Sequence, residues 1–141
     1  MRIIKLSNKD KSFPDRKRVD SYFLKKLPNR NPPGKFRLTQ GRVAKDSIEI
    51  GEKLIFSYKT EIIYIGLSAS GRIDNSDEDM DMYPFYFIID IDSLVPAKGN
   101  LSDIESMFLK AGIKKNLVST RGWPRIQDSP VTKSVWNNIK A

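Results

Sequence analysis

The chain has 141 residues, an apolar fraction of 39% and a net charge of +8, and it contains no cysteine and no histidine. Its length is that of one folded domain. The two absent residue types exclude disulfides, zinc sites built on cysteine or histidine, cysteine nucleophiles and any triad with a histidine base. No stretch of sequence is long and apolar enough to span a membrane, and no signal-peptide core is present, so we expect a soluble, cytoplasmic protein.

Charge is distributed unevenly along the chain. Basic residues dominate the segment 1–45 and return after Lys98, whereas the segment 74–92 carries carboxylates and no Lys or Arg. A basic surface with a separate acidic loop is typical of proteins that bind a polyanion, most simply nucleic acid. A lysine-rich surface that is merely solvated is the alternative that charge alone leaves open.

The predicted elements begin with a short strand at 2–6 and a polar loop. A helix follows over 16–27, because four apolar residues fall on one of its faces: Val19, Tyr22, Phe23 and Leu27. Pro28 ends this helix. After a loop with two prolines and a glycine, a short strand is predicted at 36–39.

Two adjacent antiparallel strands, 54–58 and 62–67, form the centre of the predicted fold. Both are rich in β-branched and aromatic residues and are bounded by turn residues. Their nearly continuous hydrophobicity predicts strands covered on both faces, as in the middle of a small barrel. Ser57 and Ser68 lie within or just after this apolar wall, where small polar residues suit a pocket lining or a purely structural role.

The acidic segment 74–81 has the alternating carboxylates of a calcium loop, but it lacks the glycine and the terminal glutamate of an EF-hand, so we expect an exposed turn. An aromatic-rich strand is predicted at 83–92. A helix over 101–112 is predicted to start with a capping box of Ser102 and Glu105 and to end at Gly112. Its core face consists of Leu101, Ile104, Phe108 and Leu109. A last helix starts near Thr132 and places Trp136 in the core.

Three segments, in this order, resemble the EVE domain of the PUA-like superfamily. The first, GEKLIFSY at 51–58, is a glycine-opened turn that leads into an apolar strand; the second is the partner strand at 62–67, which carries a glycine. The third, SPVTKSVWNNI at 129–139, is similar to the closing Pro-Val-Thr helix of that family. This sequence has Phe13 near the place of the family's early tryptophan, and Lys59 in place of the histidine after the strand tyrosine.

We read the chain as an α+β fold, and the resemblance implies a small PUA-like β-barrel with flanking helices, as a single domain over 1–141. It also implies a non-catalytic module that flips a modified, often methylated, base into an aromatic pocket. Such modules are frequently fused to a nuclease or NTPase in modification-dependent restriction. We therefore expect the N-terminal recognition module of a longer protein, with nucleic acid as its partner, DNA before RNA, and with no cofactor or metal.

Reading one base requires its removal from the stack, at a cost of a few kcal/mol, and stacking on an aromatic ring returns about 1–3 kcal/mol. The candidate base-binding residues are Tyr58, Trp123, Tyr64, Ser57 and Ser68, with Tyr83 and Phe56 as further stacking candidates. Trp123 lies between Arg121 and Arg125, in a loop that can stack on a base and hold adjacent phosphates. The alternative is a tryptophan that plugs the barrel end. The candidate phosphate-binding residues are Arg121, Arg125, Arg16, Lys17, Arg18 and Arg42.

Two other classes of function stay open. One is a protein-interaction or structural module in which the acidic loop and the basic segment pair with a partner; the other is an RNA-binding PUA-like domain. Catalysis by the chain alone is not favoured, because the sequence has no carboxylate cluster with a neighbouring lysine, no Walker loop and no dinucleotide fingerprint.

Overall fold

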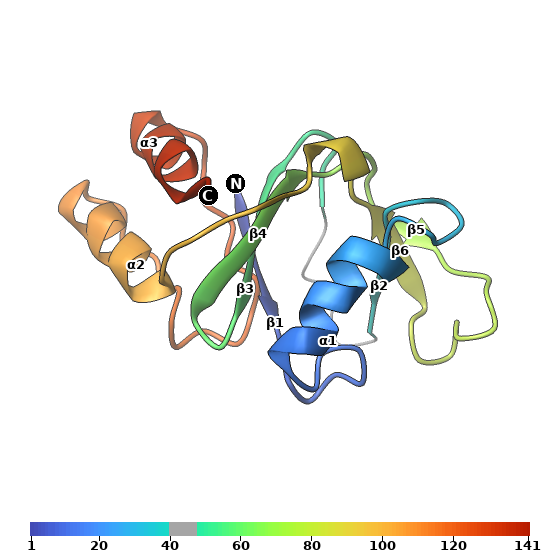
Figure 1. Cartoon of the computed structure of the whole chain (residues 1–141). Coiled ribbons are helices and arrows are strands. Elements are labelled where there is room, and N and C mark those ends of the chain that lie inside the picture. Colours follow the sequence, from blue (N-terminus) through green and yellow to red (C-terminus); the bar gives the residue numbers. More distant parts are fainter. Residues whose placement is uncertain (40–47) are drawn as a thin grey trace.

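The structure, a computed structural model, describes residues 1–39 and 48–141. This part of the chain combines helices with two β-sheets, which confirms the predicted α+β class (Figure 1). The elements in chain order are β1 (Arg2–Leu6), α1 (Arg16–Ser21), η1 (Tyr22–Lys26), β2 (Lys35–Leu38), β3 (Lys53–Tyr58), β4 (Glu61–Leu67), β5 (Ile73–Asp74), β6 (Phe85–Ile88), η3 (Ile91–Ser93), β7 (Val95–Pro96), α2 (Leu101–Lys110) and α3 (Pro130–Ile139).

The first sheet, sheet A, has the strand order β1-β3-β4-β7. The predicted pair of adjacent antiparallel strands is confirmed as the β3–β4 hairpin. Its turn residues Lys59 and Thr60 have φ values of +49° and +67°. Positive φ at both central residues is the turn geometry that matches the right-handed twist of a hairpin, here without the usual glycine. β1 pairs with β3 in parallel, with Ile4 opposite Phe56.

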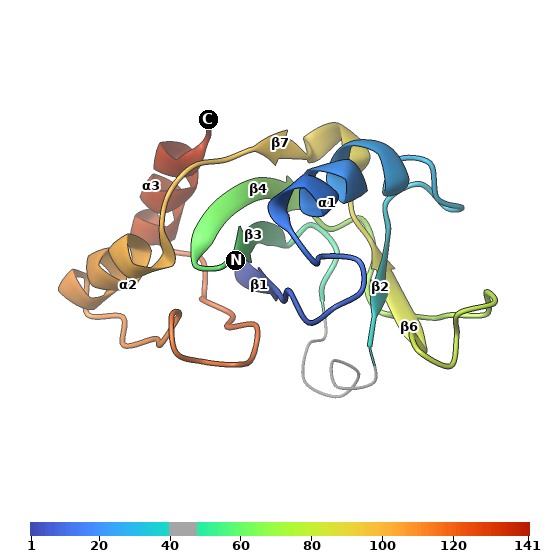
Figure 2. The ribbon, with the colours of Figure 1, turned by 60° about the horizontal axis from the view of Figure 1, so that its bottom comes forward.

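β3 and β4, the central strands of sheet A, are buried on both faces, as their nearly continuous hydrophobicity predicted. One face, with Ile3, Ile55 and Ile65, packs in a core with residues of α2 and α3. The other face, with Ile4 and Phe56, packs against α1, η1 and the second sheet. Alternate residues of a strand point to opposite faces, so a strand between two cores must be apolar at nearly every position. Figure 2 shows the two sides, with α2 and α3 on one side of sheet A and α1 on the other.

The second sheet, sheet B, has the order β2-β6-β5. It joins sheet A at one corner, where Ser68 bridges Ile89 after the end of β4. The backbone N–H of Ala69 donates to Ile88, and that of Asp90 donates to Leu67, at 2.7 and 2.8 Å between N and O. Within the described residues the strands form two sheets and no single closed ring.

The helix predicted over 16–27 is confirmed, but its second half is π-helical. The Leu27 N–H donates to the carbonyl of Tyr22, five residues back, at 2.8 Å. A π-turn widens the helix and changes the direction of the side chains that follow it. Tyr22 and Phe23 both lie in the core, as their place on one helical face predicted. The Phe23 ring stacks on Tyr64 with a centroid distance of 4.7 Å.

The helix predicted over 101–112 is confirmed as α2 from Leu101 onward, but its predicted cap is wrong. Asn100 caps the helix by accepting the Ser102 N–H, at 2.9 Å. The Glu105 carboxylate is not a cap; it accepts the N–H of Leu117 at 2.7 Å and so fastens the segment after the helix. Leu109, predicted for the core face, is 60% exposed. A capping box between Ser129 and Thr132 instead starts α3, two residues before the predicted position.

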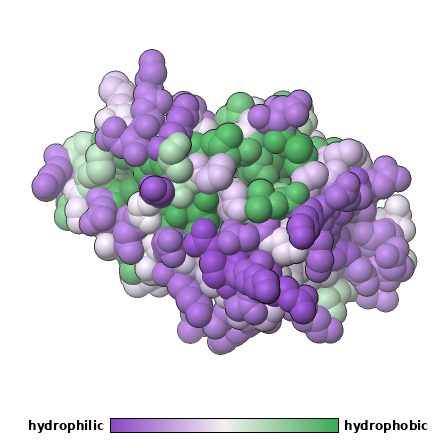
Figure 3. Space-filling model, viewed as in Figure 1, coloured by the Kyte–Doolittle hydropathy of each residue, from purple (hydrophilic) through white to green (hydrophobic). Residues whose placement is uncertain are grey.

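The strand predicted at 83–92 is shorter, because Asp90 caps the short helix η3 and ends the extended backbone. Figure 3 shows the outer surface in the view of Figure 1, with apolar residues over its middle and hydrophilic residues along its lower and right-hand margins. In residues 1–39 and 48–141, no helix has the length and apolarity needed to cross a membrane.

Candidate functional site

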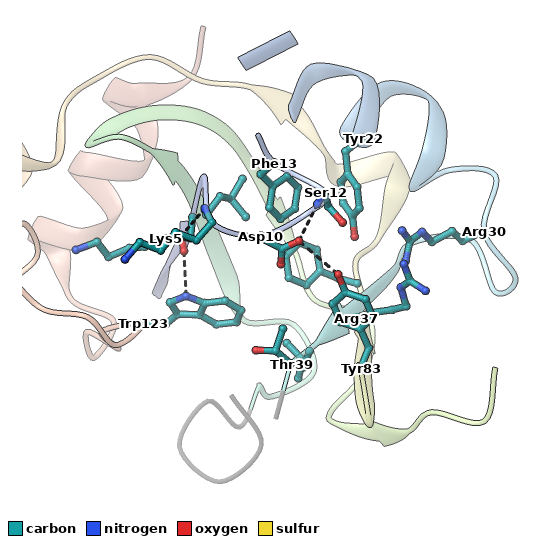
Figure 4. Close-up of a pocket in the computed structure, with 15 residues that line it drawn as sticks. Lys5, Asp10, Ser12, Phe13, Tyr22, Arg30, Arg37, Thr39, Tyr83 and Trp123 are labelled. Atoms are coloured by element: carbon teal, nitrogen blue, oxygen red, sulfur yellow. Dashed lines mark hydrogen bonds between the residues drawn. The ribbon is translucent and has the colours of Figure 1, made fainter. Parts of the chain in front are cut away.

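A cavity of about 270 Å³ opens beside the end of β1, between sheet A and β2. The loop 7–13, the helix η1 and the segment that carries Trp123 complete its walls. Figure 4 shows aromatic side chains from these separate segments gathered around one space. The aromatic residues of the lining are Phe13, Tyr22, Phe36, Tyr83 and Trp123.

Four of these rings form a continuous wall. Phe13 meets Tyr22 edge to face at 4.9 Å between centroids, and Tyr22 meets Phe36 in the same way at 6.0 Å. Phe36 in turn contacts Trp123 at 6.2 Å. Edge-to-face contacts of this kind are favourable and fix the ring planes. The wall is therefore preformed in the free protein.

Trp123 is held in place by β1. Its indole N–H donates to the carbonyl of Lys5, at 3.3 Å. The Lys5 ammonium donates to the carbonyls of Leu117, Val118 and Thr120, with N–O distances of 2.9, 2.9 and 2.6 Å. These bonds fasten the C-terminal segment to the first strand and fix the position of Trp123.

Asp10 is the acidic group of the cavity. Its carboxylate accepts the backbone N–H of Ser12 at 2.8 Å and the Tyr83 hydroxyl at 3.4 Å (Figure 4). A carboxylate has about four acceptor sites, so Asp10 retains capacity for donors of a ligand. The apolar side chains of Leu6 and Leu38 complete the lining.

Two arginines form the opposite side of the cavity. The Arg30 guanidinium lies over the Tyr22 ring at 5.0 Å from its centroid, and that of Arg37 lies over Tyr83 at 4.4 Å. Arg37 donates from Nη1 to Asp79 at 2.7 Å. Its Nε atom is buried and has no hydrogen-bond partner among the described residues.

The pKa of the Tyr22 hydroxyl depends on burial and on these two arginines. Burial raises the pKa of Tyr22 to about 12, although the nearby guanidiniums of Arg30 and Arg37 lower it. The phenol is therefore neutral at physiological pH and can donate a hydrogen bond.

The tyrosines predicted to bind a base lie in the core beside the cavity. The Tyr58 hydroxyl donates to the carbonyl of Phe13 at 2.9 Å, so Tyr58 supports the loop that carries a cavity ring. The Tyr64 hydroxyl donates to Asp20 at 3.0 Å, and burial followed by this bond raises the pKa of Tyr64 to about 12. Of the predicted base-binding residues, only Trp123 lines the cavity.

The two predicted serines are buried. Ser57 is 1% exposed and lies opposite Lys5 in sheet A. The Ser68 hydroxyl accepts the N–H of Glu52 at 3.0 Å and donates to the carbonyl of Glu49. Ser68 therefore fixes the turn before β3, and neither serine lines the cavity.

The predicted phosphate-binding residues are dispersed. Arg16 pairs with Asp20 and Glu61, at 3.3 and 3.4 Å. Lys17 and Arg18 are exposed on α1, and Arg121 is exposed in the segment before Trp123. Arg42 lies outside the described residues.

Arg125, also predicted to bind phosphate, is engaged by acidic residues. Its guanidinium pairs with Glu49 at 2.9 Å and with Glu52 at 3.5 Å. The hydrogen bond to Glu49, with the charges of Glu52 and Glu49, raises the pKa of Arg125. This arginine is part of a second, polar surface away from the aromatic cavity.

The acidic segment 74–81 is more than an exposed turn. Asp77 pairs with Lys35 at 3.0 Å, and Asp79 with Arg37 at 2.7 Å. These two ion pairs attach the segment to β2 and so to the arginine side of the cavity. Among the described residues, no group of three Asp or Glu side chains could hold a metal ion.

Sequence reasoning missed most of the cavity. Tyr83 was a stacking candidate, and Phe13 is the residue near the early tryptophan position of the EVE family. Tyr22 lies on the apolar face of its helix, and Phe36 alternates with Lys35 and Arg37 on its strand, patterns that indicate only a place in the core. The available signal for the arginines was that Arg37 directly follows Phe36 in the strand and that Arg30 lies in the loop before it.

Comparisons of this chain with protein-family models, with curated proteins and with solved structures found no match. The cavity therefore carries the functional argument by its own geometry.

Proposed function

We propose that this domain is a non-catalytic nucleic-acid-binding module that holds one flipped, modified base of DNA in the aromatic cavity. The observation that carries the proposal is the cavity itself, in which five aromatic residues and two arginines from separate segments surround one space of about 270 Å³. Pockets for drug-sized ligands start near 300 Å³, so this volume suits a single planar ring system.

The chemistry of the lining supports a base over other planar ligands. Aromatic walls stack on any base, and the Asp10 carboxylate accepts from the N–H groups of a base edge. Leu6 and Leu38 offer apolar contact to a methyl group. Basic residues in the lining outnumber the one acidic residue, which disfavours a cationic ligand and favours one that carries phosphates.

We also propose that the fold is PUA-like, with sheets A and B as the two halves of an open barrel. The support is the junction at Ser68 and Ile89, where β4 leads from one sheet to the edge of the other. In this proposal the cavity lies in the opposite, unpaired seam, between β1 and β2, where a nucleotide has access to the interior.

The test uses Trp123 as the reporter. Trp136 lies on α3 and is replaced by phenylalanine, so that Trp123 is the sole tryptophan. Single-stranded and duplex oligonucleotides, unmodified or carrying 5-methylcytosine, 5-hydroxymethylcytosine or N6-methyladenine, are titrated at two salt concentrations. We expect quenching of Trp123 by stacking, with a preference among the bases that persists at high salt.

Substitutions distinguish binding in the cavity from binding to a basic surface. Tyr83→Ala removes one ring and is expected to weaken binding by about 1–3 kcal/mol. Lys133→Gln removes one exposed charge of α3 and should leave the base preference unchanged. Binding that is equal for all oligonucleotides and lost at high salt would overturn base recognition. No binding at all would favour the protein-interaction module.

A further inference from the structure

We propose that Arg30 and Arg37 form a phosphate-binding subsite, which holds the phosphate of the same nucleotide whose base lies among the aromatic rings. This inference rests on the proposed function, because it assigns the part of the ligand that the arginine side of the cavity binds. The group that the subsite binds is a phosphate. It can be either an internal phosphodiester or a terminal phosphate.

The strongest observation is the Nε atom of Arg37. It is buried without a hydrogen-bond partner among the described residues, while Nη1 of the same guanidinium donates to Asp79 at 2.7 Å. An unpaired buried donor is costly, and a charged one more so, and native structures keep few of them. A ligand oxygen at this side of the cavity would satisfy the donor.

Arg37 is oriented before any ligand arrives. Its guanidinium packs on the Tyr83 ring, and its Nη1 atom is held by Asp79, so few rotamers remain open to it. Asp77 lies 3.8 Å from the same Nη1 but is engaged at 3.0 Å by Lys35. The acidic segment thus fixes one edge of the guanidinium and leaves the Nε edge for an acceptor.

Arg30 supplies the second cation. No carboxylate of the described residues lies within 4.0 Å of its guanidinium, which packs against the Tyr22 ring. Arg30 and Arg37 both lie near enough to the Tyr22 hydroxyl to lower its pKa, and Figure 4 shows both side chains in the part of the cavity that contains Tyr22. Two guanidiniums held together repel each other unless an anion lies between them, and phosphate oxygens match their planar donor geometry.

The remaining charges of the cavity agree with this assignment. Lys9 adds a third cation to the lining, and Lys5 is already engaged by three carbonyls. Asp10 is the acidic residue of the lining, and it accepts from Ser12 and Tyr83. The lining therefore offers one acceptor for the donors of a base edge and more cations than that carboxylate neutralises, which favours a ligand that carries a phosphate.

The experiment compares ligands that differ only in phosphate. 5-Methyl-2′-deoxycytidine, its 5′- and 3′-monophosphates, and a dinucleotide with an internal phosphodiester and no terminal phosphate are titrated against Trp123 fluorescence in the Trp136→Phe protein. We expect phosphate-containing ligands to bind about tenfold or more tightly than the nucleoside. The dinucleotide and the monophosphates distinguish an internal from a terminal phosphate.

Matched variants test whether the two arginines cause the preference for ligands with a phosphate. Arg30→Gln and Arg37→Lys should reduce the advantage of phosphate to about twofold, where each variant's nucleotide affinity is compared with its own nucleoside affinity. Arg37→Lys keeps the charge beside Asp79 but removes the Nε donor. Lys133→Gln, away from the cavity, should retain the full advantage. Equal binding of nucleoside and nucleotides by the unsubstituted cavity would overturn the subsite while leaving base binding intact. Loss of base recognition in the oligonucleotide titration would instead overturn the proposed function itself.

Discussion

Lys5 illustrates how a single side chain positions the cavity. Its ammonium donates to three carbonyls of the segment 117–120, and its own carbonyl accepts the Trp123 indole N–H. Hydrogen bonds from charged donors are stronger than neutral ones, and a carbonyl deprived of its donor must find water or remain unpaired. Lys5 thus couples β1 to the loop that supplies an aromatic wall.

We expect Lys5→Met to lower the free energy of unfolding by about 2–4 kcal/mol, because the side chain keeps its length but leaves three carbonyls without their donor. Urea denaturation followed by circular dichroism measures this change. Lys133→Met, at an exposed position of α3, should change stability by less than about 0.5 kcal/mol. An equal effect of the two substitutions would show that the Lys5 bonds contribute nothing to stability.

At the scale of residues, the sequence identified Trp123 for the cavity but also selected Tyr58, Tyr64, Ser57 and Ser68, which lie elsewhere. The reason is physical. An aromatic residue on a strand looks the same in sequence whether it packs in the core or borders an opening. The cavity is assembled from segments far apart in the chain, and only tertiary structure brings Phe13, Phe36 and Tyr83 together.

The loop between η1 and β2 depends on Gly34. Its φ is +86°, and a Cβ at this position would overlap the carbonyl oxygen of Ile89. The Gly34 N–H donates to Leu27 at 2.9 Å, and its carbonyl accepts the Ile89 N–H at 2.8 Å. The backbone of the loop therefore touches β6 directly, and this contact places Arg30 at the cavity.

We expect Gly34→Ala to destabilise the protein by more than about 2 kcal/mol, since strain at positive φ adds to a backbone clash. Gly112→Ala is the matched control, because Gly112 has a φ of +81° but no atom within 4 Å of the added Cβ. Thermal unfolding of both variants measures how much stability the backbone clash costs beyond the strain at positive φ. An equal loss of stability in the two variants would mean that the strain at positive φ accounts for the whole effect.

The ion pairs that attach the acidic segment 74–81 to β2 should weaken in acid. Desolvation raises the pKa of Asp77, but hydrogen bonds from Lys35, from the Asp79 N–H and from Asn75 outweigh it, so the pKa falls below its ordinary value of 3.8. A lowered folded-state pKa stabilises the fold above the unfolded pKa, and this contribution is lost as the pH falls through the folded value.

Amide hydrogen exchange of Asp79 should therefore accelerate as the pH is lowered below about 3.8, relative to its intrinsic rate. In Asp77→Asn the acceleration should disappear, because the position no longer titrates. Unchanged protection of Asp79 in acid would show that the segment is held by other contacts.

At the scale of elements, the pattern of apolar residues was sufficient to predict the helices and strands, but it was insufficient to predict where they end. The nearly continuous hydrophobicity of β3 and β4 and the apolar face of the helix 16–27 are local patterns, so the sequence alone indicates these elements. The role of Glu105, by contrast, is set by its reach to the segment 117–118, which is a long-range contact that no local pattern contains. The join between the two sheets likewise depends on residues distant in sequence.

For the molecule as a whole, the important feature is the pair of cores on the two sides of sheet A. Phe108 of α2 is fully buried in the core that faces α2 and α3, whereas the cavity belongs to the other core. We expect Phe108→Ala to lower the free energy of unfolding by about 3–5 kcal/mol. Among molecules that remain folded, nucleotide affinity should be unchanged.

Urea denaturation and the Trp123 titration, measured on the same preparation below the unfolding transition, test this separation. Met107→Ala on the same helix serves as control, since Met107 is 36% exposed. A parallel loss of stability and affinity in Phe108→Ala would mean that the two cores act as one unit.

The parallel pairing of β1 with β3 has a consequence for the order in which the strands can pair during synthesis. β1 is synthesised before β3, yet Arg2 cannot pair until Leu54 exists, and Leu6 must wait for Tyr58. The β3–β4 hairpin, by contrast, closes between neighbours in sequence and loses little chain entropy in doing so. We therefore expect the hairpin to form first on a nascent chain and the earlier strand to dock against it afterwards. Until it docks, β1 is an apolar strand without its sheet partner, and such strands are prone to misassembly.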